Sequence, residues 1–398
     1  MTEQHEAEAG RARLASALLA NGSLGADWLA TYHAVPRHWF VPALVWPGQA
    51  DGVRQGEAVN RHADPAAWWK AVYSDIPLTT QWDDGDHAGF GRGTTPTSSN
   101  SMPTMVFSML AALDVDDGHR VLEIGTGTGW NAALLSHRLG SERVFTVEVD
   151  EDTAAEAQPR LARAGYSPTL LVGEGADGHP DGAPFDRVIA TCSVRRIPYA
   201  WVAQSRPGAV IVAPWGPEYG GEAVARLVVG EDGTASGRFV GSSAFMRLRR
   251  QRTARPGGLE YLSGPWPADG MRSSTPLSPE ALADWLAMFA IGVQVPAAFP
   301  LIERYADGTY TLWLHDTAVT SWATVDREPG RTAYEVVRSG PRHLWNEVES
   351  AWRWWDAHDR PGFDRFGLTV TPDGHTVWLD SPDSPVPVRT GSATRSRS

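Results

Sequence analysis

The sequence predicts an α/β fold: a doubly wound, mostly parallel sheet followed by a small C-terminal α+β domain. Strand-like hydrophobic runs alternate with helical patterns between residues 120 and 213, which is the element order of a parallel sheet with right-handed crossovers. After residue 276 the pattern changes to short strands separated by turn signals. With 398 residues, 42% of them hydrophobic and 21% charged, the chain is long enough for two globular domains.

The N-terminal part shows few regular patterns. Residues 11–32 are expected to form a helix with a glycine-containing break, and residues 33–81 to be irregular because they hold five prolines. Residues 83–101 form a polar stretch that we expect to be a loop. Residues 105–113 have the apolar spacing of a helix.

Next comes the alternating region, whose strands and helices we expect in a fixed order. The expected strands are 120–124, 144–148, 169–172, 187–191 and 209–213, and the expected helices are 130–139, 151–164 and 199–205. Residues 227–229 and 238–245 are candidates for antiparallel strands at one edge. Together with the N-terminal part, these elements form a predicted catalytic domain over residues 1–250.

The rest of the chain is expected to be a linker, a small domain and a tail. The predicted boundaries are 251–275 for the linker, 276–382 for the domain and 383–398 for a disordered tail. The domain's expected helices are 278–291, which starts with a capping serine followed by a proline, and 341–355. Its expected strands are 310–315, 321–325, 333–337, 368–371 and 376–379.

The predicted helix 341–355 carries several tryptophans on one face. Leu344, Trp345, Val348, Trp352 and Trp355 have helical spacing. Packing against the small sheet is one reading, and a tryptophan surface that binds a folded peptide is the other.

Composition excludes several classes of function. The net charge is −12 and no concentrated basic run stands out, which argues against nucleic-acid binding. One cysteine allows neither an intrachain disulfide nor a cysteine-rich zinc site, and the histidines lack metal-ligand spacing. From this pattern we expect no bound metal. No apolar run long enough to span a membrane and no signal-peptide pattern is present, so we expect a cytoplasmic protein.

The segment from Val121 to Trp130 is the most informative part of the chain. A hydrophobic strand leads into three glycines at alternate positions, and a helical stretch follows. Glycines allow a sharp turn close to a ligand, and a helix N-terminus offers unpaired N–H groups. This layout predicts a nucleotide-type cofactor site, although a plain tight turn would also use glycines. The residues concerned are Glu123, Gly125, Thr126, Gly127, Thr128 and Gly129.

The order of these residues distinguishes between cofactors. A dinucleotide site usually has G-x-G-x-x-G, whereas E-x-G-x-G-x-G resembles motif I of Rossmann-like S-adenosyl-L-methionine methyltransferases. That cofactor carries an ammonium and a sulfonium group, which suit an acid such as Glu123. Glu148 ends the next strand, where it is placed to accept hydrogen bonds from ribose hydroxyls. Glu174 follows the third strand and is either an adenine contact or a solvated loop acid. Val149, Gly175 and Thr191 complete the expected cofactor-binding set.

Further segments resemble the protein-L-isoaspartate (D-aspartate) O-methyltransferase family. They are HAVPRHWFVP at 33–42, YSDIPL at 73–78, SMP at 101–103, PFDRVI at 184–189 and RPGA at 206–209. The resemblance covers roughly residues 10–250. It implies a carboxyl O-methyltransferase that acts on L-isoaspartate or D-aspartate in peptides.

The chemistry implied by this family needs no general base. A carboxylate is already ionised at pH 7, so the enzyme must mainly position and partly desolvate the reactants. Hydroxyl groups can hold the carboxylate without suppressing its nucleophilicity. Ser101 matches the family's Ser-x-Pro, although it could also cap the helix that begins near Pro103. Ser98, Ser99 and Ser193 are further candidates for contact with the substrate carboxylate.

Three features depart from the usual family pattern. The polar stretch around residues 83–97 is longer than is usual there, and Arg195 and Arg196 could either attract an acidic peptide or be plain surface charges. The domain after residue 276 is not expected in repair enzymes. Its segments 341–349 and 365–370 resemble extended variants associated with ribosomally made lanthipeptides and graspetides. That resemblance implies a cyclised precursor peptide whose ordinary aspartate is methylated, after which the ester closes to a succinimide (aspartimide).

Three hypotheses therefore follow from the sequence. The first is methylation of aspartate in a modified precursor peptide, which the long loop and additional domain favour. The second is repair of isoaspartate in damaged proteins. The third is a non-catalytic protein that binds S-adenosyl-L-methionine or peptides.

Overall fold

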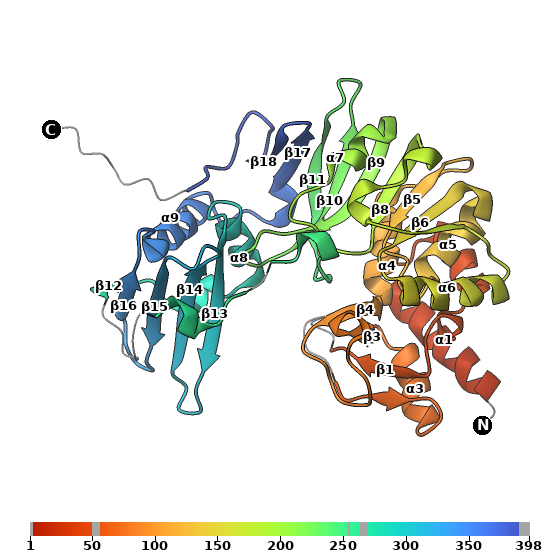
Figure 1. The fold of residues 1–398 in the computed structure, drawn as a ribbon, viewed down its shortest axis with the longest axis horizontal. Helices are drawn as coiled ribbons and strands as arrows, with labels where there is room; N and C mark the ends of the chain where they lie inside the picture. The colour runs from red at the N-terminus through yellow and green to blue at the C-terminus, as the bar shows by residue number, and fades with distance from the viewer. Residues whose placement is uncertain (1–2, 50–55, 254, 263–269, 390–398) are drawn as a thin grey trace.

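The computed structural model describes residues 3–49, 56–253, 255–262 and 270–389 (Figure 1). Its largest unit is a nine-stranded sheet with the order β18-β17-β11-β10-β9-β8-β5-β6-β7. Strands β9, β8, β5, β6 and β7 are parallel to one another, which confirms the predicted doubly wound fold. These strands are β5 (Val121–Ile124), β6 (Val144–Glu148), β7 (Thr169–Val172), β8 (Phe185–Ala190) and β9 (Ser205–Trp215).

Helices cover the parallel part of this sheet. They are α4 (Pro103–Leu113), α5 (Trp130–Leu139), α6 (Glu151–Arg163) and α7 (Tyr199–Ala203). Strands β5 and β6 are buried at every position, as expected for parallel strands with helices on both faces. Their continuous hydrophobic character is what made them predictable.

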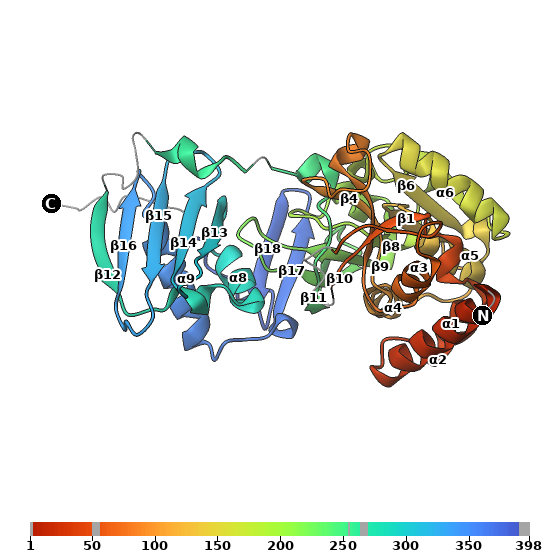
Figure 2. The same cartoon turned by 90° about the horizontal axis from the view of Figure 1, so that it is seen from below.

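Four antiparallel strands extend the sheet beyond β9. They are β10 (Ala223–Val229), β11 (Ala235–Ser242), β17 (Phe366–Thr371) and β18 (Gly374–Leu379). Strand β17 pairs with β11, so the hairpin that the sequence assigned to the C-terminal domain lies in the large sheet (Figure 2). Nothing local to β17 and β18 specifies this partner, because the pairing joins segments more than a hundred residues apart.

The N-terminal region is more regular than its prolines suggested. Its strands β1 (Leu44–Pro47), β2 (Val59–Asn60), β3 (Leu78–Trp82) and β4 (Pro96–Asn100) form an antiparallel sheet in the order β2-β1-β3-β4. Its helices are α1 (Glu3–Ala20), α2 (Ala26–Ala34) and α3 (Pro65–Val72). The prediction of an irregular segment at 33–81 and a loop through residue 100 was wrong. Pro47 and Pro96 lie at strand ends and Pro65 opens a helix, positions where proline costs no hydrogen bond.

A second, five-stranded antiparallel sheet follows, in the order β12-β16-β15-β14-β13. Its strands are β12 (Met271–Thr275), β13 (Ala298–Arg304), β14 (Tyr310–Asp316), β15 (Trp322–Arg327) and β16 (Tyr334–Ser339). The sequence did not predict β13. This strand contains Pro300 and lies at the edge of the sheet, where proline is tolerated.

Two helices pack beside this sheet. They are α8 (Trp285–Gly292) and α9 (Leu344–Ala357). The predicted helix 278–291 is split, because Ser278 caps only a short turn and Asp284 caps α8 separately. On α9, Trp345 and Trp355 are 3% and 6% exposed, so this face packs inward and is not a tryptophan-rich surface.

The predicted linker and the predicted tail are both more ordered than expected. The predicted linker 251–275 includes strand β12, and residues 254 and 263–269 lie outside the described part of the chain. Of the predicted disordered tail, residues 383–389 are described, and Val386 anchors them to the large sheet: its amide donates to the Val377 carbonyl, and its side chain is 5% exposed. Residues 390–398 lie outside the described residues. Among the helices that are described, none has the length and apolar character needed to cross a bilayer.

Replacing Leu368 by alanine should lower the free energy of unfolding by about 2–5 kcal/mol, because the side chain is fully buried in the core of the large sheet. Urea unfolding of the wild type and variant measures this. Val240→Ala, on the neighbouring strand β11 and 52% exposed, should change stability by less than about 0.5 kcal/mol. Equal effects of the two substitutions would contradict the placement of β17 in this sheet.

Candidate functional site

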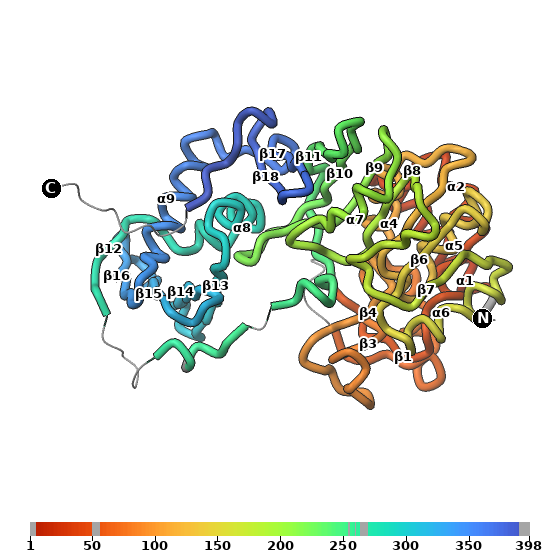
Figure 3. Tube along the Cα trace, turned by 45° about the horizontal axis from the view of Figure 1, so that its top comes forward, coloured from red at the N-terminus to blue at the C-terminus, as the bar shows by residue number. Residues whose placement is uncertain are grey.

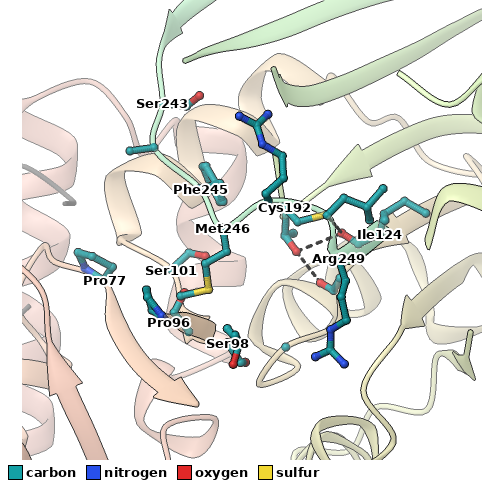
Figure 4. A pocket seen from close by; sticks show the side chains of 18 of the residues that line it. Pro77, Pro96, Ser98, Ser101, Ile124, Cys192, Ser243, Phe245, Met246 and Arg249 are labelled. Atoms are coloured by element: carbon teal, nitrogen blue, oxygen red, sulfur yellow. Dashed lines mark hydrogen bonds between the residues drawn. The ribbon is translucent and has the colours of Figure 1, made fainter. Parts of the chain in front are cut away.

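The carboxyl ends of the parallel strands border a cavity of about 1260 Å³, part of which is drawn in Figure 4. In doubly wound sheets ligands bind at this edge, where the chain crosses from one half of the sheet to the other. Here that point lies between β5 and its neighbours β6 and β8. Since most small-molecule sites measure roughly 300–1,000 Å³, the cavity has room for a cofactor and part of a second molecule.

The three glycines of the predicted motif form the turn between β5 and α5. Gly125, Gly127 and Gly129 have φ values of +94°, +52° and +89°, a conformation that other residues rarely adopt. A Cβ atom on Gly125 would lie 2.7 Å from the Thr191 hydroxyl, and one on Gly129 would lie 3.2 Å from the Leu161 side chain. Gly125 and Gly127 line the cavity, so the turn presents bare backbone to it.

The threonines of the motif have separate partners. The Thr126 and Thr146 hydroxyls are 2.7 Å apart, and Thr128 accepts a hydrogen bond of 2.9 Å from Asn100. Both motif threonines line the cavity and are almost fully buried. They tie the glycine turn to β6 and to β4.

Glu123 does not lie where the sequence placed it. Its side chain is fully buried and is not among the residues that line the cavity. It accepts hydrogen bonds from Asn131 at 2.7 Å and from Thr146 at 2.5 Å. Burial raises the pKa of Glu123 to about 7. Glu123 therefore supports the glycine turn from beneath, and it has no surface on the cavity where the sequence placed a contact with the cofactor.

Glu148 lies in the cavity wall, as the sequence predicted, with Val149 beside it. Its carboxylate accepts hydrogen bonds from the Gly127 amide at 2.9 Å and the Asp150 amide at 3.1 Å. Burial raises the pKa of Glu148, while these backbone donors lower it. Each oxygen keeps a lone pair for a further donor.

The third cofactor segment is only partly confirmed by position. Gly175 is buried and lines the cavity, and a Cβ there would lie 2.6 Å from Ile124. Glu174 is exposed and is not among the lining residues, which matches the solvated loop acid. Thr191 lines the cavity and donates to the Gly125 carbonyl at 2.5 Å.

Three of the four candidate serines face the cavity. Ser98, Ser99 and Ser101 line it from β4 and the start of α4, and Figure 4 labels Ser98 and Ser101 there. Ser193 is fully buried and does not line it. The backbone of Ser193 instead bonds to Met246 and Leu248, which holds the segment after β11 against the end of β8. Ser193 is therefore misplaced in the predicted catalytic set.

Arg37, which the sequence did not single out as a site residue, does not line the cavity but holds residues that do. Its guanidinium is 1% exposed and makes bonds to the Asn100 side chain and to five backbone carbonyls. Two of those carbonyls belong to Asn100 and Ser101. Burial lowers the pKa of Arg37, whose charge is held by these acceptors. The signal was available, because Arg37 lies inside the 33–42 segment that carried the family resemblance.

A second missed feature is an arginine-rich run at residues 247–255, where five of nine residues are arginine. This run contradicts the expectation of no concentrated basic segment. Its Arg249 lies within 3.0 Å of Asp84 and 3.1 Å of Asp150. Arg252 lies 2.8 Å from Asp84. These pairs attach the polar 83–97 stretch to the cavity wall.

The arginines that the sequence did single out lie elsewhere. Arg195 pairs with Glu218 at 2.7 Å and Arg196 is exposed, and neither lines the cavity. Within the described residues no group of three or more His, Cys, Asp or Glu side chains could hold a metal ion.

Comparisons with known proteins match much of the region that carries these motifs. Residues 54–252 match the family model "Protein-L-isoaspartate(D-aspartate) O-methyltransferase (PCMT)". A protein-L-isoaspartate O-methyltransferase of Methanosarcina mazei is 38% identical over 149 residues, which are 37% of this chain and 56% of that protein. Protein-L-isoaspartate O-methyltransferase 2 of Polaromonas sp. is 33% identical over 225 residues, 56% of this chain and 88% of that protein. The chain thus spans little more than half the length of the first relative and most of the second.

One solved structure extends the likeness beyond the catalytic region. It is described as protein-L-isoaspartate O-methyltransferase and has a TM-score of 0.50 and 18% identity, covering 93% of this chain and 100% of its own. A likeness at this identity concerns the fold alone. Because 93% of this chain is covered, the shared fold extends past residue 250 into the C-terminal unit.

Replacing Arg37 by methionine should lower the free energy of unfolding by at least about 3 kcal/mol, since bonds to a charged group contribute about 1.5–3 kcal/mol each and the buried carbonyls would lose their donor. Arg37→Lys should recover only part of this loss, because a single ammonium cannot reach the same acceptors. Chemical unfolding measures both variants. Arg13→Ala, on the exposed side of α1, is the control and should stay near wild type. A mild effect at Arg37 equal to that at Arg13 would rule out its structural role.

Glu123 should make stability depend on pH. Its pKa is near 4.5 when unfolded and about 7 when folded, so between these values the folded state binds more protons and stability falls as the pH rises. Above about pH 7 the loss is complete. The free energy of unfolding of Glu123→Gln should rise by about 2–4 kcal/mol relative to that of the wild type between pH 4.5 and about pH 8, since one pKa unit corresponds to about 1.36 kcal/mol. Urea unfolding without added ligand measures this, and a flat difference between the two proteins would refute it.

Proposed function

The chain belongs to the protein-L-isoaspartate (D-aspartate) O-methyltransferase family, and from this premise we propose that it uses S-adenosyl-L-methionine to methylate an L-isoaspartyl carboxylate in a peptide. One observation carries the proposal: Ser98, Ser99 and Ser101 line the same cavity as the glycine turn and Glu148. A carboxylate-binding set and a cofactor-binding set thus share one enclosure.

The cavity residues fit the proposed cofactor. The glycine turn leaves bare backbone at the cavity, where any Cβ on Gly125 would meet Thr191. Glu148 ends β6 with lone pairs available to ribose hydroxyls, and Val149 lies beside it. Bound there, S-adenosyl-L-methionine supplies an electrophilic methyl group.

The chain's own residues then have to position a carboxylate. A substrate carboxylate is ionised at neutral pH and needs no base to become a nucleophile. The hydroxyls of Ser98, Ser99 and Ser101 can donate hydrogen bonds to it, and Arg37 fixes the backbone that carries them. Arg249 and Arg252 are engaged by Asp84 and Asp150, so their charge is not free to bind the carboxylate too strongly.

A second candidate substrate is an ordinary aspartate in a cyclised precursor peptide, whose methyl ester then closes to a succinimide with loss of methanol. The polar stretch 83–97 favours it, because Asp84 holds this stretch against the cavity through two arginines. Because this stretch is longer than is usual in the family, it gives the cavity a longer border, which suits recognition of a constrained peptide. The names of the relatives favour the isoaspartyl substrate.

The wild-type enzyme should transfer labelled methyl from S-adenosyl-L-methionine to a linear isoaspartyl peptide, as an alkali-labile ester, and leave the same peptide with ordinary aspartate unlabelled. Ser101→Ala should lower kcat by about 10–100-fold through loss of alignment, whereas Ser273→Ala, exposed on β12, should not. A cyclised precursor with ordinary aspartate is tested in parallel by mass spectrometry. Labelling of that precursor alone, followed by loss of methanol, would select the second candidate. No transfer to either peptide would refute the proposed function.

Glu148→Ala should weaken S-adenosyl-L-methionine binding by about 10–100-fold, the loss expected for hydrogen bonds to a charged group. Isothermal titration calorimetry measures the Kd. Glu174→Ala is the matched control, since this acid is exposed and outside the cavity wall, and its Kd should remain near that of the wild type. Unchanged affinity in the Glu148 variant would refute the ribose contact.

A further inference from the structure

One aromatic residue of the catalytic region packs inside the C-terminal unit, and one aromatic residue of the C-terminal unit lines the catalytic cavity. Tyr219, from the loop between β9 and β10, is 1% exposed and packs in the apolar core of the second sheet with Leu282 and Ile291. In return Trp285, the first residue of α8, lines the catalytic cavity. Figure 3 shows α8 beside this loop. The C-terminal unit therefore supplies part of the cavity wall.

The loop between β9 and β10 and helix α8 are packed too closely for one to move past the other. A Cβ on Gly221 would lie 2.3 Å from the Phe289 amide nitrogen and 2.5 Å from the Trp285 carbonyl. The Trp285 indole N–H donates to the Glu222 carbonyl at 3.2 Å. The Asp284 side chain accepts hydrogen bonds from the Leu286 and Ala287 amides and so fixes the start of α8. Loop and helix thus hold Trp285 in one place at the cavity.

Trp285 lies far from the proposed cofactor end. It bonds to the residue that precedes β10, whereas Glu148 ends β6, and β9, β8 and β5 lie between these strands. With a strand spacing of about 4.8 Å, four steps across the sheet correspond to roughly 19 Å. The cavity therefore extends well beyond the cofactor end, on the side where α8 closes it.

Part of the cavity wall at this end is apolar. Met105 and Met109 of α4 line the cavity together with Phe245 and Trp285. Helix α4 lies on the β10 side, since Arg226 of β10 donates to the Ala112 carbonyl. Methionine side chains adapt to varied apolar partners, and an aromatic wall adds a large contact area.

The charged side chains that line this end have partners: Arg247 donates to the Gly216 carbonyl at 3.1 Å, and Arg255 lies 3.7 Å from Glu218. Glu222 accepts from the Ser243 hydroxyl at 3.0 Å and the Phe245 amide at 2.9 Å. Glu218 pairs with Arg195 at 2.7 Å. An entering group therefore meets apolar side chains more than unpaired charge.

We propose that Trp285 is a specificity-determining residue, and that the wall it forms with Met105, Met109 and Phe245 is a subsite for an apolar side chain next to the methylated residue of the peptide. This inference rests on the proposed function, because it assigns the far end of the same cavity to the peptide substrate. It gives the C-terminal unit a direct part in substrate selection.

Peptides that differ only in the residue beside isoaspartate test this subsite, with glycine, leucine or phenylalanine at that position. The wild type should prefer leucine or phenylalanine over glycine by about 10-fold or more, the range in which an apolar subsite discriminates. Trp285→Ala should reduce this ratio of kcat/KM to less than about 3, mainly through KM, and Trp285→Phe should restore most of it. Trp354→Ala, a half-buried residue of α9 outside the cavity wall, should keep the wild-type ratio.

The same peptides are also titrated by calorimetry in the presence of S-adenosyl-L-homocysteine, so that binding preference is measured without turnover. Thermal unfolding confirms that each variant is folded. A folded Trp285→Ala protein that keeps the preference, or a wild type without one, would overturn the subsite. Absence of methyl transfer with a preference that is retained in binding would refute the proposed function and leave the subsite standing.

Discussion

The buried guanidinium of Arg37 is the constraint on which the site depends. It draws together backbone from the end of α3, the start of β3 and the junction of β4 with α4. It also orients Asn100, which donates to Thr128 in the glycine turn. One side chain thus sets the distance between the serine segment and the turn, and a guanidinium can do this because its five rigid donors match several carbonyls at once.

The cavity that results holds many charges but leaves few of them free. Glu148 is engaged by backbone amides, and the arginines after β11 are engaged by Asp84 and Asp150. Under the proposed function this pairing matters, because a free cation beside a substrate carboxylate would stabilise the reactant more than the transition state. The neutral hydroxyls that we propose to orient the carboxylate are those of Ser98, Ser99 and Ser101.

The C-terminal unit is attached to the catalytic sheet in two ways. Strand β17 extends the sheet by pairing with β11, and α8 packs on the loop that carries Tyr219. A unit held at both points cannot act as a freely tethered domain. The unit therefore contributes to the shape of the cavity, and it does so through Trp285.

The sequence by itself determined the doubly wound sheet, because buried parallel strands such as β5 and β6 are continuous hydrophobic runs and the glycines of their turn need positive φ. It also singled out Glu148 and Ser101, which both line the cavity, because they lie near strand or helix ends in short, recognisable patterns. Only the tertiary structure decided that Glu123 is buried under the turn, that Ser193 faces away and that β17 joins the large sheet. Side-chain direction at an element's end and the partner of an edge strand depend on contacts between distant segments, which local spacing does not encode.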